Sequence, residues 1–152
     1  MKQKIEGGKK KSKLLKGKKL TKALDDAVRD FFKIKYGENP TCFVCGHKDS
    51  WWDPKTAPRG IQVGHYISRR CTALRWDLRN LFPQSSGCNI IHNTNPAPFT
   101  MAIIKEYGVE RIKLLEKIAK DAVGNRVTDT QKREWLDELN KMVESFDKLP
   151  VK

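Results

Sequence analysis

Three cysteines in the middle of the chain have a spacing suited to binding a metal. Cys42 and Cys45 form a C-x2-C pair, and Cys88 follows later in the chain. A C-x2-C turn presents two thiolates to one tetrahedral zinc ion, and a structural zinc site takes four ligands of this kind. Cys88 is the natural third ligand. We therefore predict a structural Zn²⁺ site that contains Cys42, Cys45 and Cys88.

The sequence leaves the fourth zinc ligand open. Ser85 stands where a second C-x2-C pair would have its first cysteine, and serine is a poor zinc ligand. The candidates are His47, Cys71 and His92. His92 lies four residues after Cys88, so on a helix the two side chains would share a face. The alternative is that the cysteines are ordinary buried thiols, a common state of free cysteine.

A second group of residues is suited to phosphodiester hydrolysis, which needs a base, a divalent cation and positioning groups. His65, in a segment of strand-like alternation, is the candidate base. Asn89, directly after Cys88, is a candidate ligand for the cation. Three arginines follow His65 and are candidate phosphate contacts: Arg69, Arg70 and Arg75. Each has an ordinary alternative, because His65 could be a core histidine, Asn89 a helix cap and the arginines a solvated face.

The elements that would position these residues follow from apolar spacing and from turn residues. Apolar residues at intervals of three and four predict a helix over 21–37, which Thr21 caps and Gly37 ends. Residues 60–67 and 78–82 are strand candidates, and a helix starts near Gly87 and runs past His92. Residues 38–98 would form the core of the site, and helices would fill 99–152. The predicted fold class is α+β.

The charge of the chain points to a polyanion as its partner. The net charge is +13, and residues 1–22 carry ten Lys and one Glu, which leaves only +4 for the remainder. We predict that residues 1–20 form a disordered basic arm in which Lys9, Lys10 and Lys11 contact phosphates. A solubilising tail is the alternative. The absence of a long apolar run argues against a membrane span, and the cysteine usage favours a reducing compartment such as the cytoplasm.

The ordered set of these motifs resembles the phage NinG (Rap) recombination nucleases of the HNH, or ββα-metal, superfamily. The resemblance covers roughly residues 20–120. It rests on the C-x2-C pair, Gly64-His65-Tyr66-Ile67-Ser68-Arg69, Leu74-Arg75-Trp76-Asp77, Asn80-Leu81 and Gln84-x3-Cys88-Asn89. The central pattern is also similar to phage endonuclease VII, a Holliday-junction resolvase.

The resemblance implies a small zinc-stapled ββα-metal core that cleaves branched or Holliday-junction DNA during recombination. His65 would be the general base, Asn80 would orient it, and Asn89 would bind a catalytic Mg²⁺ or Mn²⁺. His92 would stand close to that metal. The enzyme would act in the host cytoplasm if the chain is phage-encoded, and a homodimer is the family expectation.

The sequence departs from the superfamily pattern at two positions. Gly64 stands where many HNH enzymes have a metal-binding Asp, and Ser85 replaces a zinc cysteine. These departures favour the alternative function, a non-catalytic zinc-containing accessory protein that binds nucleic acid. A thiol–zinc redox protein is a third interpretation, but it leaves the +13 charge unexplained.

The basic arm gives the first testable prediction. Deletion of residues 1–20 should weaken DNA binding and make its salt dependence shallower, because fewer counterions are released when fewer phosphates are neutralised. Cleavage of bound substrate should be unchanged. The measurement is the slope of log affinity against log salt concentration, and an unchanged slope would exclude the arm as a phosphate clamp.

Overall fold

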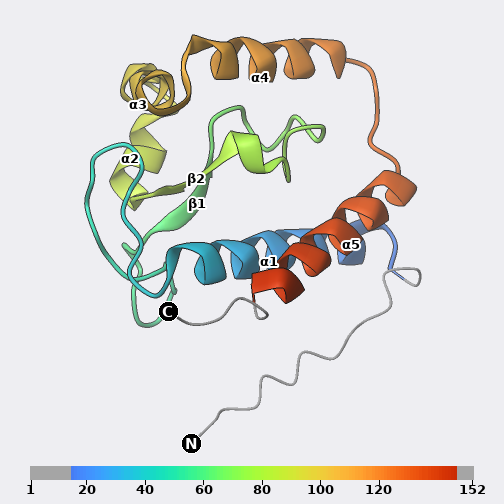
Figure 1. The fold of residues 1–152 in the computed structure, drawn as a ribbon, viewed down its shortest axis with the longest axis horizontal. Helices are drawn as coiled ribbons and strands as arrows, with labels where there is room; N and C mark the ends of the chain where they lie inside the picture. The colour runs from blue at the N-terminus through green and yellow to red at the C-terminus, as the bar shows by residue number, and fades with distance from the viewer. Residues whose placement is uncertain (1–14, 147–152) are drawn as a thin grey trace, which may run out of the picture.

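The computed structural model describes residues 15–146, which form an α+β fold built around a short β-hairpin (Figure 1). The first helix, α1, spans Gly17–Tyr36 and ends at Gly37, whose φ of 74° lies in the left-handed region. Its predicted apolar stripe is buried, and α5 (Asp129–Phe146) packs along it through Leu136 and Leu139. The two helices lie side by side in Figure 1 and form one layer of the core.

The hairpin consists of β1 (Gln62–His65) and β2 (Leu81–Gln84), which pair antiparallel with His65 opposite Leu81 and Gly64 opposite Phe82. The second strand begins later than the predicted residue 78. The Asp77 side chain accepts a hydrogen bond from the backbone N–H of Arg79 (2.9 Å), and this cap folds Leu78–Asn80 into a single 3₁₀ turn, η2. Helix α2 (Ser86–Ile91) follows directly, so the chain order is strand, strand, helix. The predicted helix was expected to run past His92, but α2 ends at Ile91 and residues 92–94 form a turn.

A second helical layer covers the other side of the hairpin. Helices α3 (Ala97–Tyr107) and α4 (Val109–Asp121) meet at Gly108, whose φ is 79°. Phe99, Ile103 and Ile112 of these helices pack against Phe82, whereas Leu81 joins the core between α1 and α5. The hairpin therefore lies between the two helical layers (Figure 1). Among the described helices, none combines the length and the apolar character needed to cross a bilayer.

The start of α1 corrects the predicted boundary between arm and helix. The helix begins at Gly17 rather than Thr21, and the residue before it, Lys16, makes no side-chain cap. The residues that were assigned to the end of the arm are anchored to α5: Arg133 Nη1 donates to the Leu15 carbonyl (3.0 Å), and the Gly17 N–H donates to Asp129 Oδ2 (3.0 Å). Lys9, Lys10 and Lys11 lie outside the described residues. A deletion limited to residues 1–14 therefore tests the arm without removing the first turn of α1.

Candidate metal centre and base

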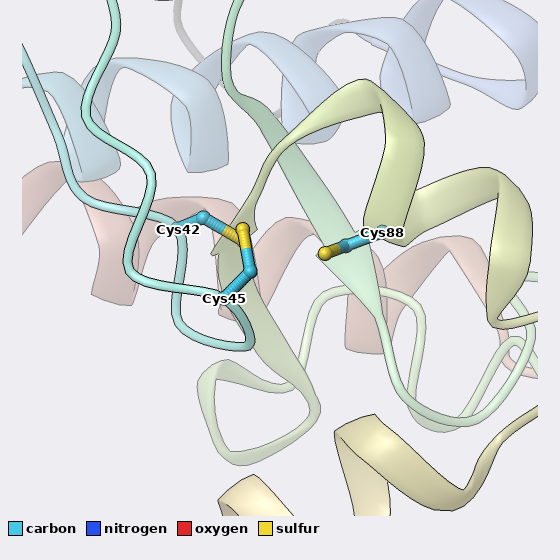
Figure 2. Close-up of side chains that lie close together, drawn as sticks. All are labelled: Cys42, Cys45 and Cys88. Carbon is cyan, nitrogen blue, oxygen red and sulfur yellow. The ribbon is translucent and has the colours of Figure 1, made fainter.

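The three predicted zinc cysteines come together, as expected from their spacing. Cys42 and Cys45 lie in a tight loop in which the Gly46 N–H donates to the Cys42 carbonyl (3.0 Å), and Gly46 adopts a φ of 77°. Cys88 approaches from α2. The three sulfur atoms lie within 4.8 Å of one another, and Figure 2 shows them gathered between the loop and the helix. This confirms that Cys42, Cys45 and Cys88 form a cluster able to hold one metal ion.

The acid–base properties of these thiols suit a cation. Burial raises the pKa of the Cys42 thiol, but hydrogen bonds from the backbone of Cys45 and Ser85 outweigh it and lower the pKa to about 7. Burial raises the pKa of Cys88 to about 11, and its hydrogen bond with Cys45 and the charge of Cys42 act in the same direction. The charge of an ionised Cys42 thus opposes ionisation of Cys88, and a positive charge between them would remove that opposition. A zinc ion would supply that charge, and zinc is the metal that thiolate ligands of this kind commonly bind.

None of the three candidates for the fourth ligand joins the cluster. His47 Nε2 lies 3.5 Å from Asp49 Oδ2, and His92 Nε2 donates to the Tyr66 carbonyl (2.8 Å). His92, one of the open candidates, is therefore not placed at the cysteine cluster, because its ring is held on the hairpin instead. Ser85 Oγ lies 3.8 Å from Cys45 Sγ. Within residues 15–146 the cluster thus offers three thiols and a neighbouring hydroxyl, and Ser85 or water is left for the fourth position.

His65, the predicted base, is held by a single backbone contact. Its Nε2 lies 2.9 Å from the carbonyl oxygen of Arg75. A carbonyl only accepts, so Nε2 carries the proton and Nδ1 keeps its lone pair. Burial lowers the pKa of His65, and the charges of Arg75 and Arg69 lower it further, although the hydrogen bond to the Arg75 carbonyl opposes them. The ring is therefore neutral near pH 7 and can accept a proton at Nδ1.

The pocket at His65 has a volume of about 160 Å³ and a basic lining. It lies between β1, α1 and the loop that follows β1. Its lining residues are Asp25, Val28, Arg29, Val63, His65, Arg69, Arg75 and Trp76. The sequence predicts Arg69 as a phosphate contact, but it does not single out Arg29 of α1. Arg70, a further predicted phosphate contact, is exposed and does not line this pocket. The arrangement can receive an anion beside a neutral imidazole.

Asp25 is a residue of this site that sequence reasoning missed. It accepts hydrogen bonds from Arg75 Nη2 (2.8 Å) and Nε (3.2 Å) and from Trp76 Nε1 (2.8 Å). The guanidinium of Arg75, a predicted phosphate contact, is thereby paired with α1, while its carbonyl holds His65. No spacing pattern distinguishes Asp25 from its neighbour Asp26, so the sequence carried no signal for this role.

Asn80 acts on the loop between the strands and makes no hydrogen bond to His65 itself. The side chain is fully buried. Its Oδ1 accepts from the Ile67 N–H (2.7 Å), and its Nδ2 donates to the carbonyls of Ile67 (2.9 Å) and Leu74 (3.1 Å). These three bonds close the loop over 67–74 and so fix the position of Arg75, the next residue. The orientation of His65 thus depends on Asn80 through the backbone.

The two remaining predicted site residues lie on the opposite face of β1. Residues alternate between the two faces of a strand, so Gln62, Gly64 and Tyr66 face away from the His65 pocket. Asn89 Nδ2 donates to Gln62 Oε1 (2.8 Å), and His92 is bonded to the Tyr66 carbonyl. The structure therefore brings Asn89 and His92 together along the hairpin and places His65 across the strand from them.

The cysteine cluster gives the second prediction. The full chain should bind one zinc ion, and Cys88→Ser should weaken that binding and lower thermal stability, because the metal joins α2 to the loop at 42–45. Cys71→Ser is the matched control and should change neither property. Ser85→Cys should tighten zinc binding by supplying a fourth thiolate. Zinc content and zinc affinity, the latter by competition with a chelator, are measured for wild type and the three variants. Equal zinc affinity of wild type and Cys88→Ser would contradict the site.

Comparison with known proteins identifies one family. Neither a curated protein nor a solved structure matches the chain. The family described as bacteriophage lambda NinG protein matches residues 1–148, which is nearly the whole length. The chain belongs to this NinG family.

Proposed function

We propose that the chain is a metal-dependent DNA endonuclease of the HNH, or ββα-metal, type. The observation that carries this proposal is the state of His65, whose Nε2–H is donated to the Arg75 carbonyl and whose Nδ1 is left to accept a proton. A base held in one tautomer by a backbone carbonyl is a common arrangement in hydrolytic sites. The hairpin followed by α2, with the cysteine cluster beside it, supplies the supporting architecture.

In the proposed reaction, His65 Nδ1 takes a proton from a water molecule that attacks the phosphorus atom. Arg29 and Arg69 line the pocket and would hold the phosphate. Arg75 is held by two hydrogen bonds to Asp25 (2.8 and 3.2 Å), whereas Arg29 makes a longer, exposed ion pair with Asp26 (3.5 Å) that a phosphate can displace. The bond to the leaving 3′ oxygen then breaks as the new P–O bond forms. The preference for branched or four-way-junction DNA, and action in recombination within the host cytoplasm, come from the family resemblance.

A divalent cation, Mg²⁺ or Mn²⁺, would be held by Asn89 and His92, and these residues fit that role. His92 donates Nε2–H to the Tyr66 carbonyl, which is how metal-binding histidines are usually oriented. Its Nδ1 is buried and has no hydrogen-bond partner among the described residues. Because β1 ends at His65, the phosphate would lie across this end of the strand, with the His65 pocket on one face and Asn89 and His92 on the other. When bound there, the cation would supply positive charge for the developing negative charge on the phosphate and leaving oxygens.

The third prediction concerns the base. His65→Ala should reduce metal-dependent cleavage of a labelled four-way junction by roughly 10²–10⁴-fold, the usual contribution of a general base, while junction binding persists. His47→Ala is the matched control, because His47 is exposed beside Asp49 and lies outside the pocket. Linear duplex and single strand of the same sequence show whether the junction is preferred.

The same assay distinguishes the alternative function. A wild-type chain that binds the junction but cleaves no substrate with Mg²⁺ or Mn²⁺ would be a zinc-containing accessory protein that binds nucleic acid. Equal cleavage by wild type and His65→Ala would remove His65 from the mechanism. Chelator added to the reaction should abolish cleavage in every active variant.

The fourth prediction concerns pH. The reactive form of His65 is neutral, and the pKa of its imidazole is lowered by burial and by the arginine charges. The neutral form therefore persists to lower pH than for an exposed histidine, whose pKa is about 6.5. The acid limb of kcat/KM should have its midpoint below that value. Arg69→Gln should move the midpoint upward, since it removes a repulsive charge, and a midpoint above the ordinary value in wild type would contradict this assignment.

A further inference from the structure

Gln84 is a buried polar residue that the proposed mechanism does not use. It is the last residue of β2, and its side chain is fully buried. Neither its Oε1 nor its Nε2 has a hydrogen-bond partner within the described residues. A buried amide left without partners destabilises the fold, because it has lost its hydrogen bonds to water and gained none in return. Such a cost is expected where the group has a ligand to bind.

The amide of Gln84 lies against Gly64, where many HNH enzymes have a metal-binding Asp. A Cβ atom placed on Gly64 would lie 1.8 Å from Gln84 Oε1 and 2.7 Å from its Cδ. Gly64 does not have a positive φ, so its backbone would accept a side chain. A side chain at position 64 is excluded by space, because the Gln84 amide occupies the volume that it would need.

Two other candidate metal ligands, Asn89 and His92, lie on the same side of the hairpin. Gln62 and Tyr66 flank Gly64 on this face, and they hold Asn89 and His92 respectively through bonds of 2.8 Å each. The Asn89 amide donates its Nδ2 to Gln62, which leaves its Oδ1 for a ligand. His92 Nδ1, together with the two amide atoms of Gln84, completes the set of buried polar side-chain atoms without a partner in residues 15–146. Gln84 lies opposite Gln62 and against Gly64, and His92, at the end of α2, is bonded to Tyr66, so both residues meet the same side of the hairpin.

We infer that Gln84 Oε1 is a ligand of the divalent cation, with Asn89 Oδ1 and His92 Nδ1, in place of the carboxylate that Gly64 cannot supply. This inference rests on the proposed function for the role of the ion, but the binding itself is independent of cleavage. The ligand set is two neutral amide oxygens and one imidazole nitrogen. Such a set attracts Mg²⁺ weakly, and its imidazole favours Mn²⁺.

Mn²⁺ binding to the zinc-loaded full chain, without DNA, tests the inference. Electron paramagnetic resonance counts the free Mn²⁺, and zinc content is checked after each titration. Wild type should bind one Mn²⁺ at this site. Gln84→Met, which keeps the length of the side chain, should weaken binding by about tenfold or more. Gln84→Glu should tighten it, because a carboxylate replaces a neutral amide, and Gln131→Met on α5 is the matched control that should bind as wild type does.

A swap of the two positions separates a ligand role from a packing role. Gly64→Asp alone should lose Mn²⁺ binding and stability, because the new side chain collides with Gln84. Gly64→Asp combined with Gln84→Ala should restore Mn²⁺ binding by placing a carboxylate in the vacated space. Without metal, Gln84→Met should be at least as thermally stable as wild type, since it removes an amide without partners.

The outcomes distinguish this inference from the nuclease proposal. Mn²⁺ affinity unchanged in Gln84→Met, or no Mn²⁺ binding by wild type, would overturn the inference even if the junction is cleaved. Mn²⁺ binding that follows the expected order, in a chain that cleaves no DNA, would support the metal site and refute the nuclease. A double variant that stays folded but does not recover binding would also count against the ligand role.

Discussion

The site depends on a hairpin, β1 and β2, that would not be stable on its own. Two strands of four residues each are too short to be stable alone in water, so their geometry must come from what packs against them. Leu81 is buried against α1 and α5, and Phe82 is buried against α3 and α4. Because neighbouring residues of β2 enter two different cores, a slip of one residue in register would exchange them. The two helical layers thereby fix the strands on which His65 and Gly64 lie.

Polar contacts then fix the orientation of His65, which the apolar cores do not determine. Apolar burial is non-directional, whereas a base must present one particular nitrogen. Asn80 closes the loop after β1 with three hydrogen bonds, and Asp25 ties Arg75 and Trp76 to α1. Between these two fixed points lies the carbonyl of Arg75, which sets the tautomer of His65. Loss of Asn80 would leave the carbonyls of Ile67 and Leu74 without this donor, so its effect would reach His65 indirectly.

The cysteine cluster and the Gln84 amide occupy neighbouring parts of the same hairpin–helix junction. Cys88 and Asn89 are consecutive on α2, so a metal at the cluster would also fix the helix that carries Asn89 and His92. The Phe43 N–H donates to the Pro83 carbonyl (2.8 Å), which joins the cysteine loop to the strand next to Gln84. A structural metal would thus support the proposed catalytic one through the backbone of two short elements.

The sequence by itself determined that these helices and two strands exist, but not where each begins or ends, together with the class of the fold and the three clustered cysteines. These features follow from local periodicity, turn residues and a fixed C-x2-C spacing, all of which are readable without knowing which segments meet. Only the tertiary structure decided that Asp25 holds Arg75, that His92 is bonded to Tyr66 rather than placed at the cysteines, and that Gln84 fills the space beside Gly64. Those contacts join residues far apart in the chain, and the packing of α1 and α2 against the hairpin determines which of several chemically equivalent side chains meet.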